Sequence, residues 1–249
     1  MNKILGARTI ALVDFDSACY IAGCADTLQE CKDKVDGMLD SIQLATSCEL
    51  EVWIEGGKYK NIFRNHVAVT RPYKGTRQGK EAPPFLKEAK EYVLSKATEG
   101  LNVHLATNME AEDAVLTRAN EIGIDNVVIS CIDKDLHQQH GRFYNYRTEE
   151  TFDITEEEAH YNLYKQILTG DSVDNIPGLQ GVGPKKAEAI LEDDYPLEVA
   201  MAYAERGMPY QYLLEQSRLI YLLREWKDVF MFPVSEEEYN QLLNDGEPA

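Results

Sequence analysis

One stretch organises the sequence: Gly170-Asp171-Ser172-Val173-Asp174-Asn175-Ile176-Pro177-Gly178-Leu179-Gln180-Gly181-Val182-Gly183-Pro184-Lys185-Lys186-Ala187. Asp171 and Asp174 are three residues apart, so on a helical turn their carboxylates would face the same way and could share a hard cation. The spacing therefore predicts one half of a metal site in this stretch.

The second half of the stretch predicts an anion-binding hairpin. Its glycines indicate a tight turn, and Pro184 suits the first turn of a new helix. Lys185 and Lys186 then fall at the start of that helix, where free backbone N–H groups favour an anion. The turn residues are Gly178, Gly181 and Gly183. A phosphodiester at one end and a metal at the other is the chemistry that this combination predicts.

These residues carry a resemblance to a known family. The run from Gly178 to Ala187 has the pattern of a helix–hairpin–helix, a motif that grips the DNA backbone without reading bases. With Gly170-Asp171 and Asp174-Asn175 attached, it resembles the 5′-nuclease family, which includes flap endonucleases, bacteriophage 5′-exonucleases and the 5′-nuclease domain of bacterial DNA polymerase I. The resemblance covers most of Leu12 to Leu191.

Composition sets limits on the class of protein. A chain of 249 residues that is 44% hydrophobic can bury one core, or one core and a smaller appendage. Its apolar runs are short and broken by charge, so we expect no membrane partner. The five cysteines lack a C-x-x-C pattern, which predicts free thiols. The net charge of −18 predicts weak, salt-sensitive non-specific binding to DNA unless a local basic path exists.

Acidic residues follow several predicted strands. We expect strands at Thr9–Val13, Leu50–Ile54, Asn102–Ala106 and Asp125–Cys131, and a short edge strand at Phe143–Tyr146. Helical periodicity alternates with them, and it includes helices expected over 81–96 and 209–226. This alternation predicts an α/β fold: a central, mostly parallel sheet flanked by helices, with a C-terminal helical part. The carboxyl ends of parallel strands share one edge. The acids expected there are Asp14, Glu55, Glu110, Glu112, Asp113, Asp133 and Asp135.

Such crowded acids repel one another unless cations neutralise them, and oxygen ligands select Mg²⁺ or Mn²⁺. Two such ions can stabilise the attacking and leaving oxygens of a phosphoryl displacement. The resemblance implies a first ligand set of Asp14, Glu55, Glu110 and Glu112, and a second of Asp113, Asp133, Asp135, Asp171 and Asp174. Glu55 departs from the Asp that is usual in the family.

A locally basic segment, 63–77, lies between two of these strands. It carries Arg64, Arg71, Lys74 and Arg77, with Lys80 just beyond. Its order resembles the family pattern F-R…Y-K-x-x-R. The resemblance implies that Lys74 and Arg77, on one helix face, hold the scissile phosphate and that Tyr73 stacks on a base. DNA contacts are then expected at Arg64, Arg71, Gly181, Val182, Gly183, Lys185 and Lys186, with a K⁺ held by the hairpin carbonyls.

We therefore expect three parts: a catalytic core at 1–154 with a gateway segment at about 63–97, a helical part at 155–232, and an acidic tail at 233–249. The resemblance implies a Mg²⁺-dependent, structure-specific 5′-nuclease, a cytoplasmic monomer of the free-standing phage type that acts on duplex DNA with a 5′ flap or 5′ end in replication or recombination. Two alternatives stay open: a PIN-like ribonuclease, and a non-catalytic DNA-binding module.

Overall fold

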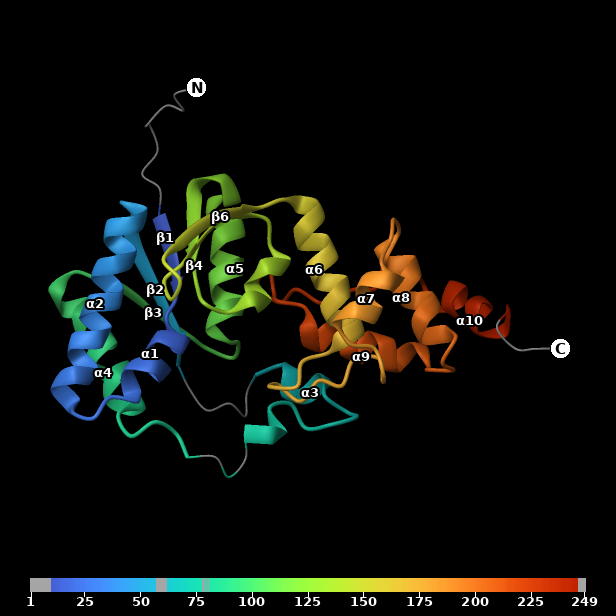
Figure 1. The fold of residues 1–249 in the computed structure, drawn as a ribbon, viewed down its shortest axis with the longest axis horizontal. Helices are drawn as coiled ribbons and strands as arrows, with labels where there is room; N and C mark the ends of the chain where they lie inside the picture. The colour runs from blue at the N-terminus through green and yellow to red at the C-terminus, as the bar shows by residue number, and fades with distance from the viewer. Residues whose placement is uncertain (1–9, 57–61, 78, 80, 246–249) are drawn as a thin grey trace, which may run out of the picture. The chain divides into compact units, whose positions relative to one another are not determined.

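The computed structural model describes residues 10–56, 62–77, 79 and 81–245. Thr9, Lys80 and residues 246–249, which entered the sequence-based predictions, lie outside this part. The described elements form two compact units. The first contains the sheet with helices α1, α2, α4 and α5 and the returning segment 222–227; the second contains residues 62–77 and helices α6 to α10 (Figure 1). The sequence-based domain boundaries stay predictions.

The first unit is built on a six-stranded sheet with the order β3-β2-β1-β4-β5-β6. All neighbouring pairs are parallel except β5 and β6, which are antiparallel. The strands are β1 (Ile10–Asp14), β2 (Glu49–Glu55), β3 (Asn102–Ala106), β4 (Val127–Ser130), β5 (Gly141–Asn145) and β6 (Glu150–Ile154). The predicted α/β class and mostly parallel sheet are confirmed.

Strand order places β1 at the point where the chain changes direction across the sheet. The chain runs from β1 to β2 and β3 on one side, and then returns to add β4 on the other side of β1. Val13 is in register with Val52 and with Ser130. Parallel sheets place ligands beyond the carboxyl ends of the strands at such a switch point. Asp14, the last residue of β1, lies there.

Helices cover both faces of this sheet, which is consistent with the mostly apolar sequences of its central strands β1 and β4. Helices α1 (Asp16–Gly23), α2 (Leu28–Thr46) and α4 (Leu86–Ser95) pack together on one face, and α5 (Ala111–Ile122) lies against β1, β2 and β4 on the other (Figure 1). Thr27 caps α2 by accepting a hydrogen bond from the Glu30 N–H at 3.1 Å. All five cysteines are free, as predicted.

Two predictions for this unit were wrong. The strand expected at Phe143–Tyr146 as an edge strand is β5, which pairs with β4 on one side and with β6 on the other. The edge strand is β6, which the sequence-based prediction did not include although apolar residues alternate there at Phe152 and Ile154. The helix expected over 81–96 begins only at Leu86, because Pro83 and Pro84 disfavour helical backbone in the residues before them.

The second unit is helical. It contains α3 (Arg64–Val67), a 3₁₀ turn at Gly75–Arg77, α6 (Glu156–Thr169), α7 (Pro184–Ile190), α8 (Tyr195–Ala204), α9 (Tyr210–Ile220) and α10 (Glu236–Asp245). Its own apolar core includes Leu168, Val199, Tyr203 and Leu213. The helix predicted over 209–226 ends at Ile220, because the chain leaves this unit there.

The segment expected as an acidic tail, 233–249, contains a helix. Residues 236–245 form α10, and the side chain of Tyr239 is fully buried with its hydroxyl donating to the Met208 carbonyl at 2.7 Å. Ser235 begins the helix in a capping box: the Glu238 N–H donates to Ser235 Oγ at 3.3 Å, and the Ser235 N–H donates to Glu238 Oε2 at 2.9 Å.

Between α6 and α7 the chain forms two successive tight turns. Gly170 (φ +65°) and Gly178 (φ +61°) are both left-handed and lie against each other, so a Cβ on Gly178 would overlap the backbone nitrogen of Gly170. Gly181 is also left-handed (φ +79°) but faces open space. Pro184 opens α7, as predicted.

This difference gives a stability prediction. Gly178→Ala combines left-handed strain with steric overlap and should lower the free energy of unfolding by about 2–5 kcal/mol. Gly181→Ala carries the conformational strain alone and should cost about 1 kcal/mol. Urea unfolding monitored by circular dichroism measures both values. Equal losses in the two variants would contradict this packing.

Candidate metal centre and phosphate-binding loop

Asp14, the last residue of β1, is a buried member of the predicted ligand set at the sheet edge. Its residue is 4% exposed, and its carboxylate Oδ1 accepts a 3.3 Å hydrogen bond from the Asp16 N–H. The Tyr146 hydroxyl donates to the Asp14 backbone carbonyl at 2.9 Å, which fixes the end of β1. The carboxylate is therefore held in place by local backbone and by β1 itself.

Other acids surround Asp14 closely enough to act on it. Burial, together with the charges of Asp16, Asp133 and Glu55, raises the pKa of Asp14 to about 8. The neighbouring Cys131 thiol has its pKa raised by burial and by the charges of Asp14, Asp133 and Glu112. Glu55 and Asp133 therefore lie within electrostatic range of Asp14, and Glu112 lies within such range of the adjoining Cys131.

A lysine that sequence reasoning missed lies in this cluster. Lys90, on α4, contacts the Asp16 carboxylate at 2.8 and 2.9 Å and lies 3.9 Å from Glu55 Oε2. Asp16 Oδ1 also accepts the Glu55 N–H at 2.8 Å. Asp16 and Lys90 therefore join α1, the end of β2 and α4, and they fix the backbone of Glu55.

The three acids at the start of α5 divide into two roles. Glu110 is the N-cap and forms a capping box with Asp113, whose Oδ2 accepts the Glu110 N–H at 3.2 Å. Asp113 is fully buried, and its Oδ1 accepts the Leu223 N–H at 3.0 Å. Both Asp113 oxygens thus have backbone donors, which assigns Asp113 to holding residues 222–227 in the first unit. Glu112, between them, is half-buried.

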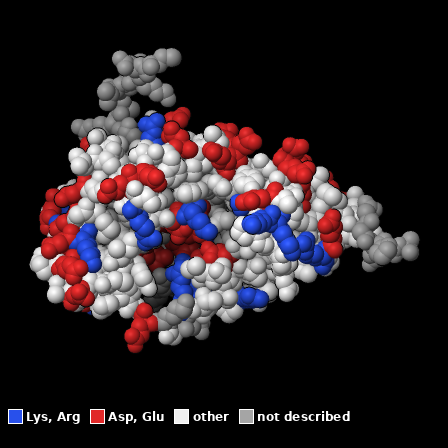
Figure 2. All heavy atoms as spheres, viewed as in Figure 1, with Lys and Arg blue, Asp and Glu red and all other residues white. Residues whose placement is uncertain are grey.

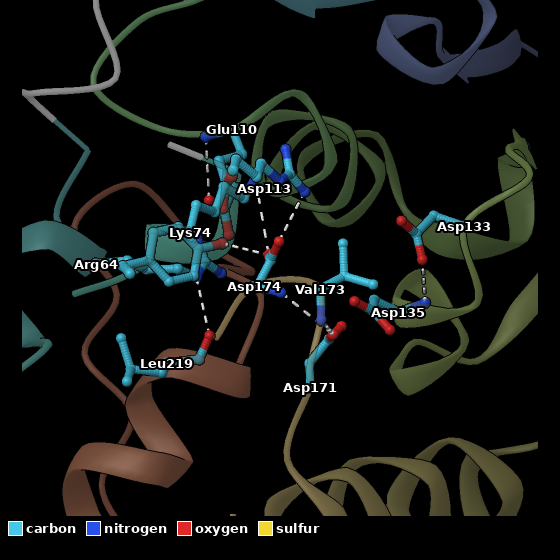
Figure 3. A network of polar contacts seen from close by, with 12 residues as sticks. Arg64, Lys74, Glu110, Asp113, Asp133, Asp135, Asp171, Val173, Asp174 and Leu219 are labelled. Carbon is cyan, nitrogen blue, oxygen red and sulfur yellow. Dashed lines mark hydrogen bonds and ion pairs between the residues drawn. The ribbon is translucent and has the colours of Figure 1, made fainter. Parts of the chain in front are cut away.

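Asp133 and Asp135 follow β4 in a short 3₁₀ turn, Lys134–Gln138. Asp133 Oδ1 accepts the Asp135 N–H at 3.0 Å, and the two side chains are drawn in Figure 3. Asp133 therefore caps this turn. Both carboxylates are half-buried.

The donor chemistry fits a hard divalent cation. Asp14 is a buried carboxylate surrounded by like charges, and the nearby Ser130 Oγ is buried with no hydrogen-bond partner among the described residues. Oxygen ligands of this kind suit Mg²⁺ or Mn²⁺. No three Asp, Glu, His or Cys side chains in the described ranges already stand in metal-binding geometry. The individual ligand assignments stay predictions.

In the second unit, Asp171 and Asp174 do not lie on a helical turn, which corrects the opening prediction. Residues 171–176 form a turn closed by two backbone hydrogen bonds between Asp171 and Ile176. Asp171 Oδ1 accepts the N–H groups of Val173 at 2.6 Å and Asp174 at 3.3 Å (Figure 3). Asp171 thus orders the turn that carries Asp174.

The Asp174 carboxylate is the meeting point of the predicted phosphate-binding residues. Its Oδ1 accepts from Arg77 Nη2 at 2.7 Å, and its Oδ2 accepts from the Tyr73 hydroxyl at 2.8 Å and lies 3.7 Å from Lys74 Nζ (Figure 3). Tyr73 is buried, so the predicted stacking on a base does not fit this structure. Lys74 and Arg77 both contact the Asp174 carboxylate.

These two cations do not share a helix face, contrary to prediction. Lys74 is left-handed (φ +52°), and only the 3₁₀ turn Gly75–Arg77 follows it. A left-handed lysine costs about 1–3 kcal/mol and persists only where surrounding contacts impose it. The convergence on Asp174 therefore comes from loop geometry.

Arg64 does not fit its predicted DNA contact. It is 1% exposed, and its guanidinium donates to the carbonyls of Leu219 at 3.0 Å and Tyr221 at 2.8 Å. Arg64 thus satisfies the C-terminal carbonyls of α9. Glu215, on the same helix, accepts the N–H groups of Val69 and Thr70, each at 2.7 Å. Arg71 is exposed.

In the hairpin, the predicted DNA-binding residues differ in solvent exposure. Gly181, Gly183, Lys185 and Lys186 are exposed, whereas Val182 is buried in the core of the second unit. Lys186 Nζ donates to the Gly181 carbonyl at 2.8 Å. An ammonium group therefore already contacts one of the carbonyls predicted to hold K⁺.

Comparisons with solved structures match this fold along almost the whole chain. A bacteriophage T5 protein co-crystallised with metal ions aligns with a TM-score of 0.67 at 16% identity, over 96% of this chain and 98% of that one. The bacteriophage T5 flap endonuclease, in a pseudo-enzyme-product complex with DNA and metal ions, aligns with a TM-score of 0.62 over 96% and 97%. The chain has the flap-endonuclease fold.

Sequence comparison finds one further similar protein among those matched. DNA polymerase I of Rhizobium leguminosarum is 28% identical over 146 residues, which is 53% of this chain and 14% of the polymerase. The chain thus matches about a seventh of that relative's length. No family model matches the sequence. Among the described helices, none has the length and apolar character needed to cross a membrane.

Asp14 gives a pH prediction for the metal-free protein. A carboxyl with a pKa near 8 when folded and near 3.8 when unfolded binds more protons in the folded state, so stability falls as pH rises from about 4 to 8. Asp14→Asn should remove this loss and raise the free energy of unfolding at pH 8 by several kcal/mol, at about 1.4 kcal/mol for each pKa unit.

The measurement is urea unfolding from pH 5 to 8.5 in a chelator, with Asp40→Asn, an exposed position on α2, as the charge-matched control. The control should follow the wild type. A pH dependence in Asp14→Asn equal to that of the wild type would show that Asp14 does not carry the effect.

Proposed function

We propose that this chain is a divalent-metal-dependent, structure-specific 5′-nuclease that hydrolyses DNA phosphodiester bonds. The observation that carries the proposal is the gathering of Asp14, Glu55, Glu112 and Asp133 at the switch point of the sheet, where the pKa of Asp14 is raised to about 8. Carboxylates in this state favour a cation strongly, since the alternative is mutual repulsion in a buried site.

The comparisons support this proposal. The T5 structures were obtained with metal ions, one of them with DNA and another with zinc, and the last is named a 5′-exonuclease. The polymerase match is consistent with a 5′-nuclease domain. For this chain, a duplex with a 5′ flap or a free 5′ end is the proposed substrate. We propose Mg²⁺ or Mn²⁺, two ions in the active form, as the cofactor.

The chain's own residues would bind and orient the reacting groups. Asp14, Glu55, Glu110 and Glu112 would hold the first ion, with Lys90 and Asp16 fixing Glu55. Lys74 and Arg77 would bind the scissile phosphate, in exchange for their present contacts with Asp174. When bound, the ions would supply charge stabilisation at the attacking and leaving oxygens.

The exposed hairpin residues Gly181, Gly183, Lys185 and Lys186 would contact the duplex backbone. A K⁺ at the hairpin would have to displace Lys186 from the Gly181 carbonyl. Figure 2 shows Asp and Glu over much of this face with fewer Lys and Arg among them, so DNA binding should be weak overall and should rest on exposed cations such as Lys185 and Lys186. Binding through those cations should weaken as salt rises. A monomeric cytoplasmic enzyme of phage replication or recombination is the proposed biological setting.

Two alternatives make different predictions. A PIN-like ribonuclease would cut single-stranded RNA in preference to flapped DNA, although the hairpin between α6 and α7 favours a duplex. A non-catalytic module would bind flapped DNA without cutting it in Mg²⁺. The crowding of acids around Asp14 favours catalysis, because a binding module gains nothing from carboxylates that repel DNA.

The test is cleavage of flapped, nicked and blunt duplexes and of single-stranded RNA, each labelled at the 5′ end, with Mg²⁺ or chelator. We expect Mg²⁺-dependent release of labelled 5′ products from DNA. Asp135→Asn and Asp171→Asn should each lower the rate at least 100-fold while binding in Ca²⁺ persists. Each lost ligand removes stabilisation of the transition state.

Asp193→Asn, which removes one charge from an exposed site in the second unit, is the matched control and should cleave like the wild type. Full activity in both Asp135→Asn and Asp171→Asn would remove the metal assignment. Preferential cleavage of RNA would favour the PIN-like alternative.

A further inference from the structure

Asn175 follows Asp174 directly in the 171–176 turn. It is left-handed (φ +63°), and its side-chain Nδ2 donates to the Pro72 carbonyl at 2.8 Å. Pro72 immediately precedes Tyr73 and Lys74. A side chain of the 171–176 turn thus holds the backbone on which the proposed phosphate-binding cations begin.

Further backbone and side-chain hydrogen bonds join the loop at residues 72–76 to the 171–176 turn. The Lys74 N–H donates to the Asp174 carbonyl at 2.8 Å, and the Thr76 hydroxyl donates to the Val173 carbonyl at 3.0 Å. Gly75 packs so closely that an added Cβ would lie 3.2 Å from Asn175 Nδ2. The two loops are therefore fitted together along residues 72–76 and 173–175.

The left-handed conformation of Lys74 requires such a frame. A long, flexible side chain has no intrinsic preference for φ +52°, and strained backbone of this kind persists only when its neighbours impose it. The Asn175 amide fixes the residue two positions before Lys74, and the Asp174 carbonyl fixes Lys74 itself. Losing the first contact would let the turn relax and spread the positions of Lys74 Nζ.

We propose that Asn175 is a positioning residue that acts through Lys74: its amide holds the Pro72–Arg77 turn so that the Lys74 ammonium is pre-organised for a phosphate of the DNA backbone. This rests on the proposed nuclease function for its consequence, but the positioning itself is a property of the second unit. Pre-organised cations raise the rate of a phosphoryl displacement more than they raise affinity.

The test variant is Asn175→Gly, because glycine accepts the left-handed backbone and removes only the side-chain amide. Glu149→Gly is the matched control, since Glu149 is also left-handed (φ +59°) but lies in the β5–β6 turn. Thermal unfolding of both variants checks that they fold. Two readouts are then compared with the wild type.

The first readout is hydrogen exchange of the Lys74 amide, followed by NMR, which does not depend on nuclease activity. Asn175→Gly should speed this exchange about tenfold, and Glu149→Gly should not change it. Unchanged exchange in Asn175→Gly would overturn the proposal, whether or not the protein cuts DNA.

The second readout is single-turnover cleavage of a 5′-flapped duplex in Mg²⁺, with affinity measured in Ca²⁺. Asn175→Gly should lower the rate about fivefold to tenfold, the effect of one lost hydrogen bond, with less than a twofold change in Kd.

In a Lys74→Met background the same substitution should have no further effect. An equal loss in that background would show that Asn175 does not act through Lys74. An inactive wild type would count against the proposed function and leave the exchange result to decide the positioning role.

Discussion

The burial of Asp14 among like charges is the constraint on which the candidate site depends. A carboxylate at the end of a central parallel strand has apolar neighbours on both faces, and here it also has Asp16, Asp133 and Glu55 within electrostatic reach. Such an arrangement of buried carboxylates is energetically unfavourable unless a cation compensates their charge. The charge of Lys90 compensates that of Asp16, and its ammonium also approaches Glu55. The ion pairs of Lys90 among the described residues do not include one with Asp14. The sheet edge thus stores an electrostatic cost that a divalent ion would relieve.

In the second unit, by contrast, the central acid is already balanced by cations. Asp174 is held by Arg77, Lys74 and the Tyr73 hydroxyl, so the acid and the two cations neutralise one another. A divalent ion on Asp174 and a phosphate on the two cations would exchange one set of partners for another. Because the new partners carry the same signs of charge as the old ones, this exchange need not change the fold of the loops.

Sequence alone predicted the elements that depend on local pattern. Apolar runs gave the first four strands, the helical repeat gave α1, α2 and α5, and Pro184 marked the start of α7. The acids after β1, β2 and β4 were found because parallel strands must end at one edge.

Residues whose role depends on distant partners could not be predicted: Arg64 binds carbonyls about 155 residues away, and Lys90 meets Asp16 across two helices. Tyr73 resembled a stacking residue, and its burial against Asp174 is visible only in three dimensions. The left-handed backbone of Asn175 is consistent with its residue type, since Asn tolerates that conformation. Its hydrogen bond to the Pro72 carbonyl could not be predicted from the sequence.

Direct binding of Mn²⁺ at pH 8, followed by electron paramagnetic resonance, tests the metal centre without any assumption about substrate. The wild-type protein should bind at least one ion tightly, and Asp14→Asn should weaken that binding at least tenfold while Asp40→Asn leaves it unchanged. Tight Mn²⁺ binding by Asp14→Asn, or its absence from the wild type, would contradict the view that these buried carboxylates form a metal site.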